Sequence, residues 1–382
     1  MIKSVELQNF RNHTRTKIEL GAGVNVLVGD NAQGKTNLLE AIYMTCVGRG
    51  FRSPRDREII RFGQDFAKVN TITDKKFGRI SVEITISTAP GKSGKQIKIN
   101  DIPIAKMGEL MGSVTCVFFN PDELKLVKES PADRRRFMDI GISQMDKVYF
   151  YNLLRYNKIL KQRNAMLKSM RATPDELRAL EIWDDQLAKY GTEIIKRRKQ
   201  FCEELRSHVI GVHGDLAPTE KLSLEYETFA EMFHVEHFVN ALRTARDKDL
   251  HLRTTTIGPH RDDIAMVLDG RDVRSFASQG QQRTVALSMK IAELKIFECV
   301  TGEKPILLLD DVLSELDENR QSKLFELIKG WQSVITTTMF QPKDSPQLLF
   351  KDRAVLSNDA SARRQMEQFP AKIFTVKDGR IV

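Results

Sequence analysis

Residues 24–42 decide the fold: Val24-Asn25-Val26-Leu27-Val28, then Gly29-Asp30-Asn31-Ala32-Gln33-Gly34-Lys35-Thr36, then Asn37-Leu38-Leu39-Glu40-Ala41-Ile42. The middle eight residues fit G-x-x-x-x-G-K-T, the phosphate-binding P-loop. The β-branched run before them predicts a buried strand, and the apolar spacing after them predicts a helix. Backbone N–H groups at the start of such a helix face a phosphate. We therefore expect residues 29–37 to bind a nucleotide. Lys35 would reach the β- and γ-phosphates and assist catalysis, and the Thr36 hydroxyl would ligate Mg²⁺.

A second stretch, Pro305-Ile306-Leu307-Leu308-Leu309-Asp310-Asp311, supplies carboxylates for such a site. Aliphatic residues that end in two acids are typical of a buried parallel strand with carboxylates at its carboxyl end. Asp310 is the predicted Mg²⁺ ligand, directly or through water. Asp311 is the predicted general base for the attacking water, and a solvated acid at a strand end is the alternative. Because Lys35 and Asp310 are 275 residues apart, a large segment is inserted between the two halves of the site.

A third stretch, Phe276-Ala277-Ser278-Gln279-Gly280-Gln281-Gln282-Arg283, precedes a run of apolar residues with helical spacing. A serine and a glycine that open a helix offer a hydroxyl and free backbone N–H groups to an anion. This pattern is common, but it lies 30 residues before Asp310. After the acidic strand come Ser314-Glu315-Leu316-Asp317 and then Val334-Ile335-Thr336-Thr337-Thr338, a second short strand with polar residues at its end.

The order of these motifs resembles the ABC-type ATPases of the SMC-like branch. The resemblance implies an α/β P-loop ATPase head, two of which sandwich two ATP molecules. It further implies that Ser278, Gly280 and Gln281 form the signature motif, which contacts the γ-phosphate bound by the partner head. Ser314 to Asp317 match the D-loop, so Asp317 is expected at the dimer seam.

Further blocks bring the chain close to the RecF family of bacterial recombination mediators. They are Leu7–His13, Phe119–Leu124, the arginine triplet 134–136 before Asp139, and Gly258-Pro259-His260-Arg261-Asp262-Asp263. This resemblance implies ATP-dependent dimers that bind DNA at single-strand gaps and at junctions of single- and double-stranded DNA. It also implies weak, DNA-stimulated ATP hydrolysis that releases the clamp, and loading of the RecA recombinase together with RecO and RecR.

The chain departs from the ABC pattern at three places. Asp311 stands where a glutamate is usual and is one methylene shorter, which predicts slow hydrolysis. A threonine, Thr336, Thr337 or Thr338, stands where transporter ATPases carry a switch histidine. No glutamine fits the Q-loop, for which Asn120 and Asp122 are the candidates.

Length and composition agree with a globular protein of two to three domains. The 382 residues carry a net charge of +9 and are 41% hydrophobic, and no window reaches the ~20 apolar residues of a membrane span. The amino-terminal residues lack the apolar core of a signal peptide, and the four cysteines are too sparse for a disulfide framework. We expect a cytoplasmic protein with reduced thiols. The expected segments are 1–128 as the first part of the head, 129–240 as a helical insertion, and 241–382 as the second part.

Two helices with apolar seams are expected in the insertion. The first covers 146–169, with Arg163 interrupting its seam, and Thr173-Pro174-Asp175-Glu176 then reads as a capping box that starts the second. Residues 128–210 hold 18 lysines and arginines against 12 acids, so most of the excess positive charge lies there. We expect the dense run Lys196, Arg197, Arg198 and Lys199 to contact DNA phosphates, with a solvated helix face as the alternative. The resemblance implies that Arg134–Arg136 instead tie the arm to the head.

Three other functions remain open at this point. Another SMC-like repair or segregation ATPase would share the head, but the short arm and the Gly258–Asp263 block disfavour it. A transporter ATPase subunit is disfavoured by the missing switch histidine and the basic arm. A DNA-binding protein that binds ATP without significant hydrolysis stays possible.

Overall fold

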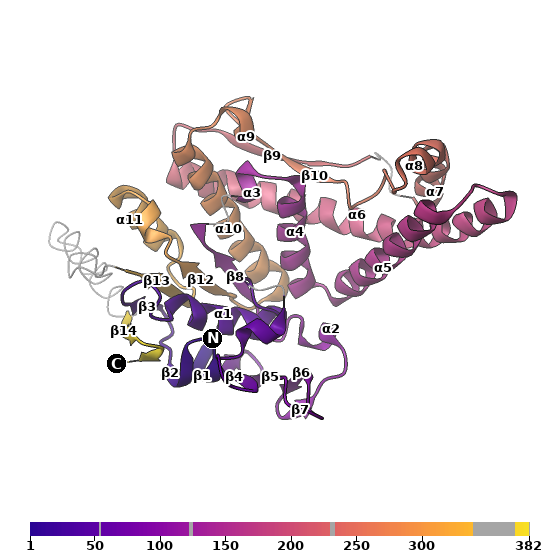
Figure 1. The fold of residues 1–382 in the computed structure, drawn as a ribbon. Coiled ribbons are helices and arrows are strands. Elements are labelled where there is room, and N and C mark those ends of the chain that lie inside the picture. The colour runs from indigo at the N-terminus through magenta and orange to yellow at the C-terminus, as the bar shows by residue number, and fades with distance from the viewer. Residues whose placement is uncertain (53–54, 122–124, 230–233, 339–370, 382) are drawn as a thin grey trace. The chain divides into compact units, whose positions relative to one another are not determined.

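The computed structural model describes residues 1–52, 55–121, 125–229, 234–338 and 371–381 (Figure 1). They divide into two compact units, Met1–Glu123 with Lys290–Val382, and Leu124–Met289. The first unit mixes helices and strands, as the sequence predicts for the head. The second unit, expected to be helical, also contains a small sheet. No helix of the described residues is both long enough and apolar enough to cross a membrane.

The first unit contains a six-stranded sheet built around the P-loop strand. Its order is β15-β14-β3-β13-β12-β8. The strands are β3 (Val24–Val28), β8 (Cys116–Phe119), β12 (Ile306–Asp310), β13 (Ser333–Thr337), β14 (Lys372–Lys377) and β15 (Arg380–Ile381). β14, β3, β13, β12 and β8 run parallel, and β12 and β13 are buried along their whole length. The predicted P-loop strand and acidic strand therefore share one sheet, separated only by β13.

A second, antiparallel sheet in this unit has the order β2-β1-β4-β5-β6-β7. Its strands are β1 (Ile2–Phe10), β2 (His13–Glu19), β4 (Phe66–Lys75), β5 (Gly78–Ser87), β6 (Gly94–Ile99) and β7 (Ile102–Pro103). Burial alternates along β4, which is the pattern of a sheet with one face in the core. The helices of the unit are α1 (Lys35–Val47), α2 (Met107–Leu110), α11 (Glu318–Leu327) and single 3₁₀ turns at Asp56–Ile59 and Leu313–Glu315.

The second unit is mostly helical. It contains α3 (Lys125–Lys128), α4 (Pro131–Met145), α5 (Lys147–Ser169), α6 (Pro174–Leu216), α7 (Val235–Thr244), α8 (Arg246–Leu252) and α9 (Val273–Phe276). A three-stranded sheet joins β9 (Leu222–Glu227), β10 (Asp263–Leu268) and β11 (Arg271–Asp272). α10 (Gln279–Thr301) begins in this unit and continues into the first.

The predicted helical hairpin is present as α5 and α6, which run side by side in Figure 1. Thr173 and Glu176 form the predicted capping box, and Pro174 occupies the first turn of α6. Arg163, which interrupts the apolar seam in the sequence, is fully buried. Its guanidinium donates to Asp184 at 2.6 Å and to Asp249 at 2.7 Å, so the interruption is a buried ion-pair cluster.

The predicted boundaries of the insertion, 129 and 240, differ from those of the unit, which runs from Leu124 to Met289. The chain beyond 240 belongs with the helices because β10 pairs with β9 over six residues. Arg134 of α4 also forms a bidentate ion pair with Asp263, at 2.5 and 2.8 Å. The strand pairing joins segments about 40 residues apart and the ion pair joins residues 129 apart, so neither is visible in local sequence patterns.

Candidate nucleotide-binding site

The P-loop lies between β3 and α1, as its sequence predicts. Gly34 has φ +113°, and a Cβ there would come within 2.9 Å of the Asn12 and His13 side chains. Only glycine fits a backbone with this dihedral and this contact. Helix α1 starts at Lys35, so its first N–H groups open onto the loop.

Two segments distant in sequence support the loop. Asn12 Nδ2 donates to the Gln33 carbonyl at 3.0 Å, and His13 Nε2 lies 3.1 Å from the Gly34 carbonyl oxygen. From the turn between β14 and β15, the Gly379 N–H donates to the Gln33 carbonyl at 2.9 Å. The Asp378 N–H donates to Gln33 Oε1 at 2.6 Å. The loop is thereby held in shape by contacts from both sides.

The predicted metal ligands are in contact. Thr36 Oγ1 donates to Asp310 Oδ1 at 2.6 Å, and Thr336 Oγ1 donates to the same oxygen at 2.8 Å. Asp310 is 5% exposed, and this burial raises the pKa of its carboxyl, while the two hydroxyls oppose the shift. Because the hydroxyl of Thr36 and the carboxylate lie together at the end of β12, they form the pair that a P-loop site uses for Mg²⁺.

Asp311 follows Asp310 in an unusual backbone conformation, with φ +52°. Its N–H donates to Thr336 Oγ1 at 2.9 Å, so Thr336 contacts both acids. Asp311 Oδ1 is buried and accepts no hydrogen bond from the described residues. A carboxylate oxygen without a partner at the edge of a pocket is available to a water molecule or to a ligand.

Lys35 is folded back onto the loop. Its Nζ donates to the carbonyls of Gly29 and Asp30, at 2.6 and 2.8 Å. Burial lowers the pKa of Lys35, and the nearby carboxylates of Asp311, Asp310 and Asp30 oppose this shift. An ammonium that donates to backbone carbonyls can exchange these partners for phosphate oxygens.

These residues surround a cavity of about 530 Å³, a size typical of sites for small ligands. Its wall contains Asn12, residues 31–37, Arg52, Asn120, Pro121, Asp310, Asp311, Thr336 and Thr338. Asn120 Oδ1 is buried and accepts no hydrogen bond from the described residues. With Thr36 and Asp310, this orphan oxygen gives a donor set of oxygens only, which fits Mg²⁺. The other Q-loop candidate, Asp122, lies outside the described residues.

No motif in the sequence predicts a role for Arg52, Asn12 or residues 378–379. Arg52 Nη2 lies 3.9 Å from Asp310 Oδ2, and the Arg52 N–H donates to Glu40 Oε1 at 3.0 Å. Glu40 is fully buried and also accepts from Arg11 Nε at 2.5 Å. The Gly-Phe-Arg sequence around residue 52 has no distinctive spacing. Asn12 belonged to a block singled out only through the family resemblance.

The predicted signature residues begin α10. Gln281 N–H donates to Ser278 Oγ at 3.3 Å, and Ser278 N–H donates to Gln281 Oε1 at 2.9 Å. Ser278 is exposed and Gly280 is half-buried. The exposed end of a 23-residue helix combines a hydroxyl with the positive end of the helix dipole, which suits an anion. Asp317, the predicted D-loop residue, is exposed and caps α11 by accepting from the Arg320 N–H at 2.9 Å.

The predicted DNA-contacting run on α6 is not one surface. Arg198 is 2% exposed and its guanidinium donates to Asp139 at 2.8 Å, to the Pro259 carbonyl at 2.6 Å and to Tyr149 Oη at 2.9 Å. A phosphate cannot reach it, so the prediction is wrong for Arg198. Arg197 is half-buried near Asp146 and Glu204, at 3.7 and 3.8 Å. Lys196 and Lys199 are exposed, and Lys196 pairs with Glu193.

The fold and the pocket define a P-loop ATPase head of the ABC and SMC class. The family model described as RecF/RecN/SMC N terminal domain matches residues 1–343. The chain belongs to the RecF family of DNA replication and repair proteins, as its similarity to curated members shows. RecF of Agathobacter rectalis is 44% identical over 342 residues, 88% of this chain and 92% of the relative. RecF of Lachnospira eligens is 42% identical over 343 residues, with the same coverage.

Comparison with solved structures also places the chain in the RecF family. A structure of the recombination mediator protein RecF with ATPrS, from the RecFOR pathway, superposes with a TM-score of 0.86 at 34% identity. It covers all of this chain and 97% of the solved one. A RecF–ATP structure gives a TM-score of 0.84 at 35% identity and covers 96% of that chain. An Smc head bound to part of ScpA shares the fold at 15% identity, with a TM-score of 0.56 over 96% of its chain.

Proposed function

We propose that this chain is a cytoplasmic recombination mediator that binds ATP with Mg²⁺, dimerises on ATP and binds DNA at gaps and at single-strand/double-strand junctions. Slow, DNA-stimulated hydrolysis then releases the DNA. Family membership supports action with RecO and RecR in loading RecA, because the matching RecF structures come from the RecFOR pathway.

The proposal rests mainly on the 2.6 Å hydrogen bond between Thr36 and Asp310, which both line the cavity. It joins the P-loop to the acidic strand, as a Mg²⁺-nucleotide site requires. Thr36, Asp310 and Asn120 would hold Mg²⁺, which supplies charge neutralisation for the phosphates. Lys35 would bind phosphate oxygens, and Asp311 would orient water and accept its proton.

Dimerisation is supported by the exposed position of Ser278 at the start of α10 and of Asp317 at the start of α11. In the proposed sandwich, Ser278, Gly280 and Gln281 bind the phosphate held by the P-loop of the partner. Each copy alone then has an incomplete site, which the second copy completes. Hydrolysis therefore depends on dimerisation.

Gel filtration with and without ATP tests the proposal. The wild type is expected to dimerise only with ATP, and Lys35→Met to lose both ATP binding and dimers. Ser278→Arg should keep ATP binding and lose dimers, since a bulky cation would block the seam. Ser223→Arg, at an exposed position of β9 in the same unit, is the control that should still dimerise. Dimers of Lys35→Met that equal those of the wild type would refute the sandwich.

A further inference from the structure

We propose that the exposed face of α5, rather than the basic run of α6, is the surface that binds the DNA backbone. This inference rests on the proposed function and specifies its DNA-contacting residues. The α5 face is defined here by Lys147, Arg155, Lys158, Lys161 and Lys168.

The distribution of charge between the two hairpin helices points to this face. The 23 residues of α5 contain six lysines and arginines and no acid. The 43 residues of α6 contain seven lysines and arginines but nine acids. The positive excess of the segment 128–210 therefore comes from α5, although the densest run of basic letters lies in α6.

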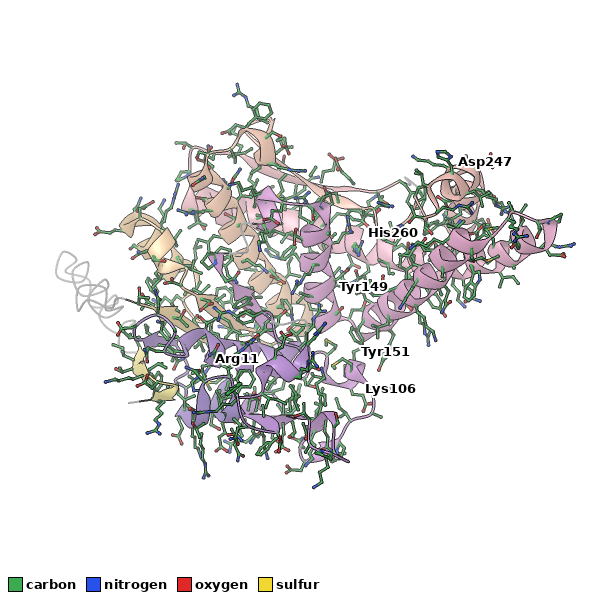
Figure 2. The ribbon with its side chains drawn as sticks, viewed as in Figure 1. Arg11, Lys106, Tyr149, Tyr151, Asp247 and His260 are labelled. Atoms are coloured by element: carbon green, nitrogen blue, oxygen red, sulfur yellow. The ribbon has the colours of Figure 1, made fainter. Side chains whose placement is uncertain are left out.

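The cations of α5 lie on one side of the helix. At 100° per residue, the four lysines fall within about 80° of one another, and Arg155 lies about 60° beyond the Lys158 end of this arc. All five are exposed, whereas Tyr149, Tyr156, Ile159, Arg163 and Leu167 are buried on the opposite side. From Lys147 to Lys168 the face extends about 30 Å, at 1.5 Å per residue. Tyr151, labelled in Figure 2, is near the end of α5 that follows α4.

The lysines of this face also lack acidic partners. Lys147, Lys158, Lys161 and Lys168 form no ion pair with any residue that the structure describes, and Arg155 contacts only the ring of Tyr190, at 5.5 Å. On α6, by contrast, Arg178, Lys196, Arg197 and Arg198 each lie beside a carboxylate. A row of unpaired cations binds a polyanion favourably, because binding releases the condensed counterions of the polyanion. The length of the face corresponds to about nine base pairs, at 3.4 Å each.

Fluorescence anisotropy with a labelled 30-base-pair duplex, in the presence of ATP, tests this assignment. The double variant Lys158→Gln/Lys161→Gln should lose two phosphate contacts. The salt slope of the binding constant should then fall by about 1.8, and affinity at 0.15 M salt should fall roughly 30-fold. The matched control, Lys196→Gln/Lys199→Gln on α6, should stay within threefold of the wild type.

ATP affinity and the thermal midpoint should be the same in both variants, since all four side chains are exposed. A second pair, Lys147→Gln/Lys168→Gln, should reproduce the loss from the two ends of the face. The assignment is overturned if the α6 variant loses at least as much affinity, or if neither α5 pair loses any, as expected of a face that binds an acidic protein. A wild type without affinity for DNA would instead overturn the proposed function itself.

Discussion

The side-chain amide of Gln281 donates a hydrogen bond to Glu220, with 3.3 Å between Nε2 and Oε1. The other oxygen of Glu220 lies 3.3 Å from Nε2 of His213, in the last turn of α6. His213 is buried, which lowers its pKa, and Glu220 opposes this shift. The long hairpin helix is therefore linked by three side chains to the start of α10, where the predicted signature lies.

We expect Glu220→Ala to weaken ATP-dependent dimerisation by about fivefold, the equivalent of one hydrogen bond of about 1 kcal/mol. Without its partner the Gln281 amide is free to turn, and the hydrogen bonds between Gln281 and Ser278 are less well ordered. Analytical ultracentrifugation with ATP measures the effect. Glu225→Ala, an exposed acid on β9, should dimerise normally. If both variants dimerise equally weakly, the effect comes from the loss of a negative charge and not from the contact with Gln281.

Asp311→Asn should lower the rate of ATP hydrolysis by at least about 100-fold, because an amide cannot accept the proton of the attacking water. ATP affinity should change by less than threefold, because Thr36, Asp310 and Lys35 are untouched. Single-turnover hydrolysis and nucleotide titration separate the two effects. Dimers formed on ATP should persist longer. Unchanged hydrolysis in this variant would favour a different base and contradict the role given to Asp311.

Arg198→Met should destabilise the protein by roughly 3–5 kcal/mol, because it leaves Asp139 and the nearly buried Asp262 without their cation. Lys196→Met removes an exposed ion pair and should cost at most about 1 kcal/mol. Urea unfolding at pH 7 compares the two. If both variants unfold at the same denaturant concentration, Arg198 is not a structural residue.

Stability should fall as pH drops from about 6.5 to about 4, partly because of His260. Burial lowers the pKa of His260 from 6.5 to about 4. Its ring lies 2.7 Å from Tyr156 Oη through Nδ1 and 3.0 Å from the Thr255 carbonyl through Nε2. In this window the unfolded chain binds a proton that the folded His260 does not, which costs up to about 1.4 kcal/mol per pH unit.

Replacing His260 by Gln removes the titrating group and keeps a donor. The difference in unfolding free energy between wild type and His260→Gln should therefore shrink as pH falls from 6.5 to 4.5. A difference that is independent of pH would show that this imidazole titrates alike in the folded and unfolded chains.

Local patterns predicted much of this molecule. The P-loop, the acidic strand and the capped start of α6 depend on residues close in sequence, so their spacing was sufficient. The extent of the second unit depended instead on the pairing of β9 with β10, between segments about 40 residues apart. The basic run of residues 196–199 led to a wrong prediction for Arg198 because its four side chains do not share one surface. Four consecutive residues of a helix point in different directions, so Arg198 enters the core while Lys196 and Lys199 stay outside.

Site residues without a motif were beyond prediction. Arg52 reaches Asp310 because its backbone is held by Glu40, and Asn12 reaches the P-loop from the turn between β1 and β2. Neither contact is accompanied by a residue pattern or a motif spacing in the sequence.

The contact between Asp378 and Gln33 can form only late in synthesis of the chain. The two residues are 345 positions apart. At ribosomal rates of ~5–20 residues per second, the turn that supports the P-loop is synthesised roughly 20–70 s after the P-loop itself. A nascent or prematurely terminated chain that has not reached residue 378 carries the phosphate-binding motif without its support. Under the proposed function, we expect such a chain to bind ATP weakly and therefore to form few ATP-dependent dimers with full-length copies.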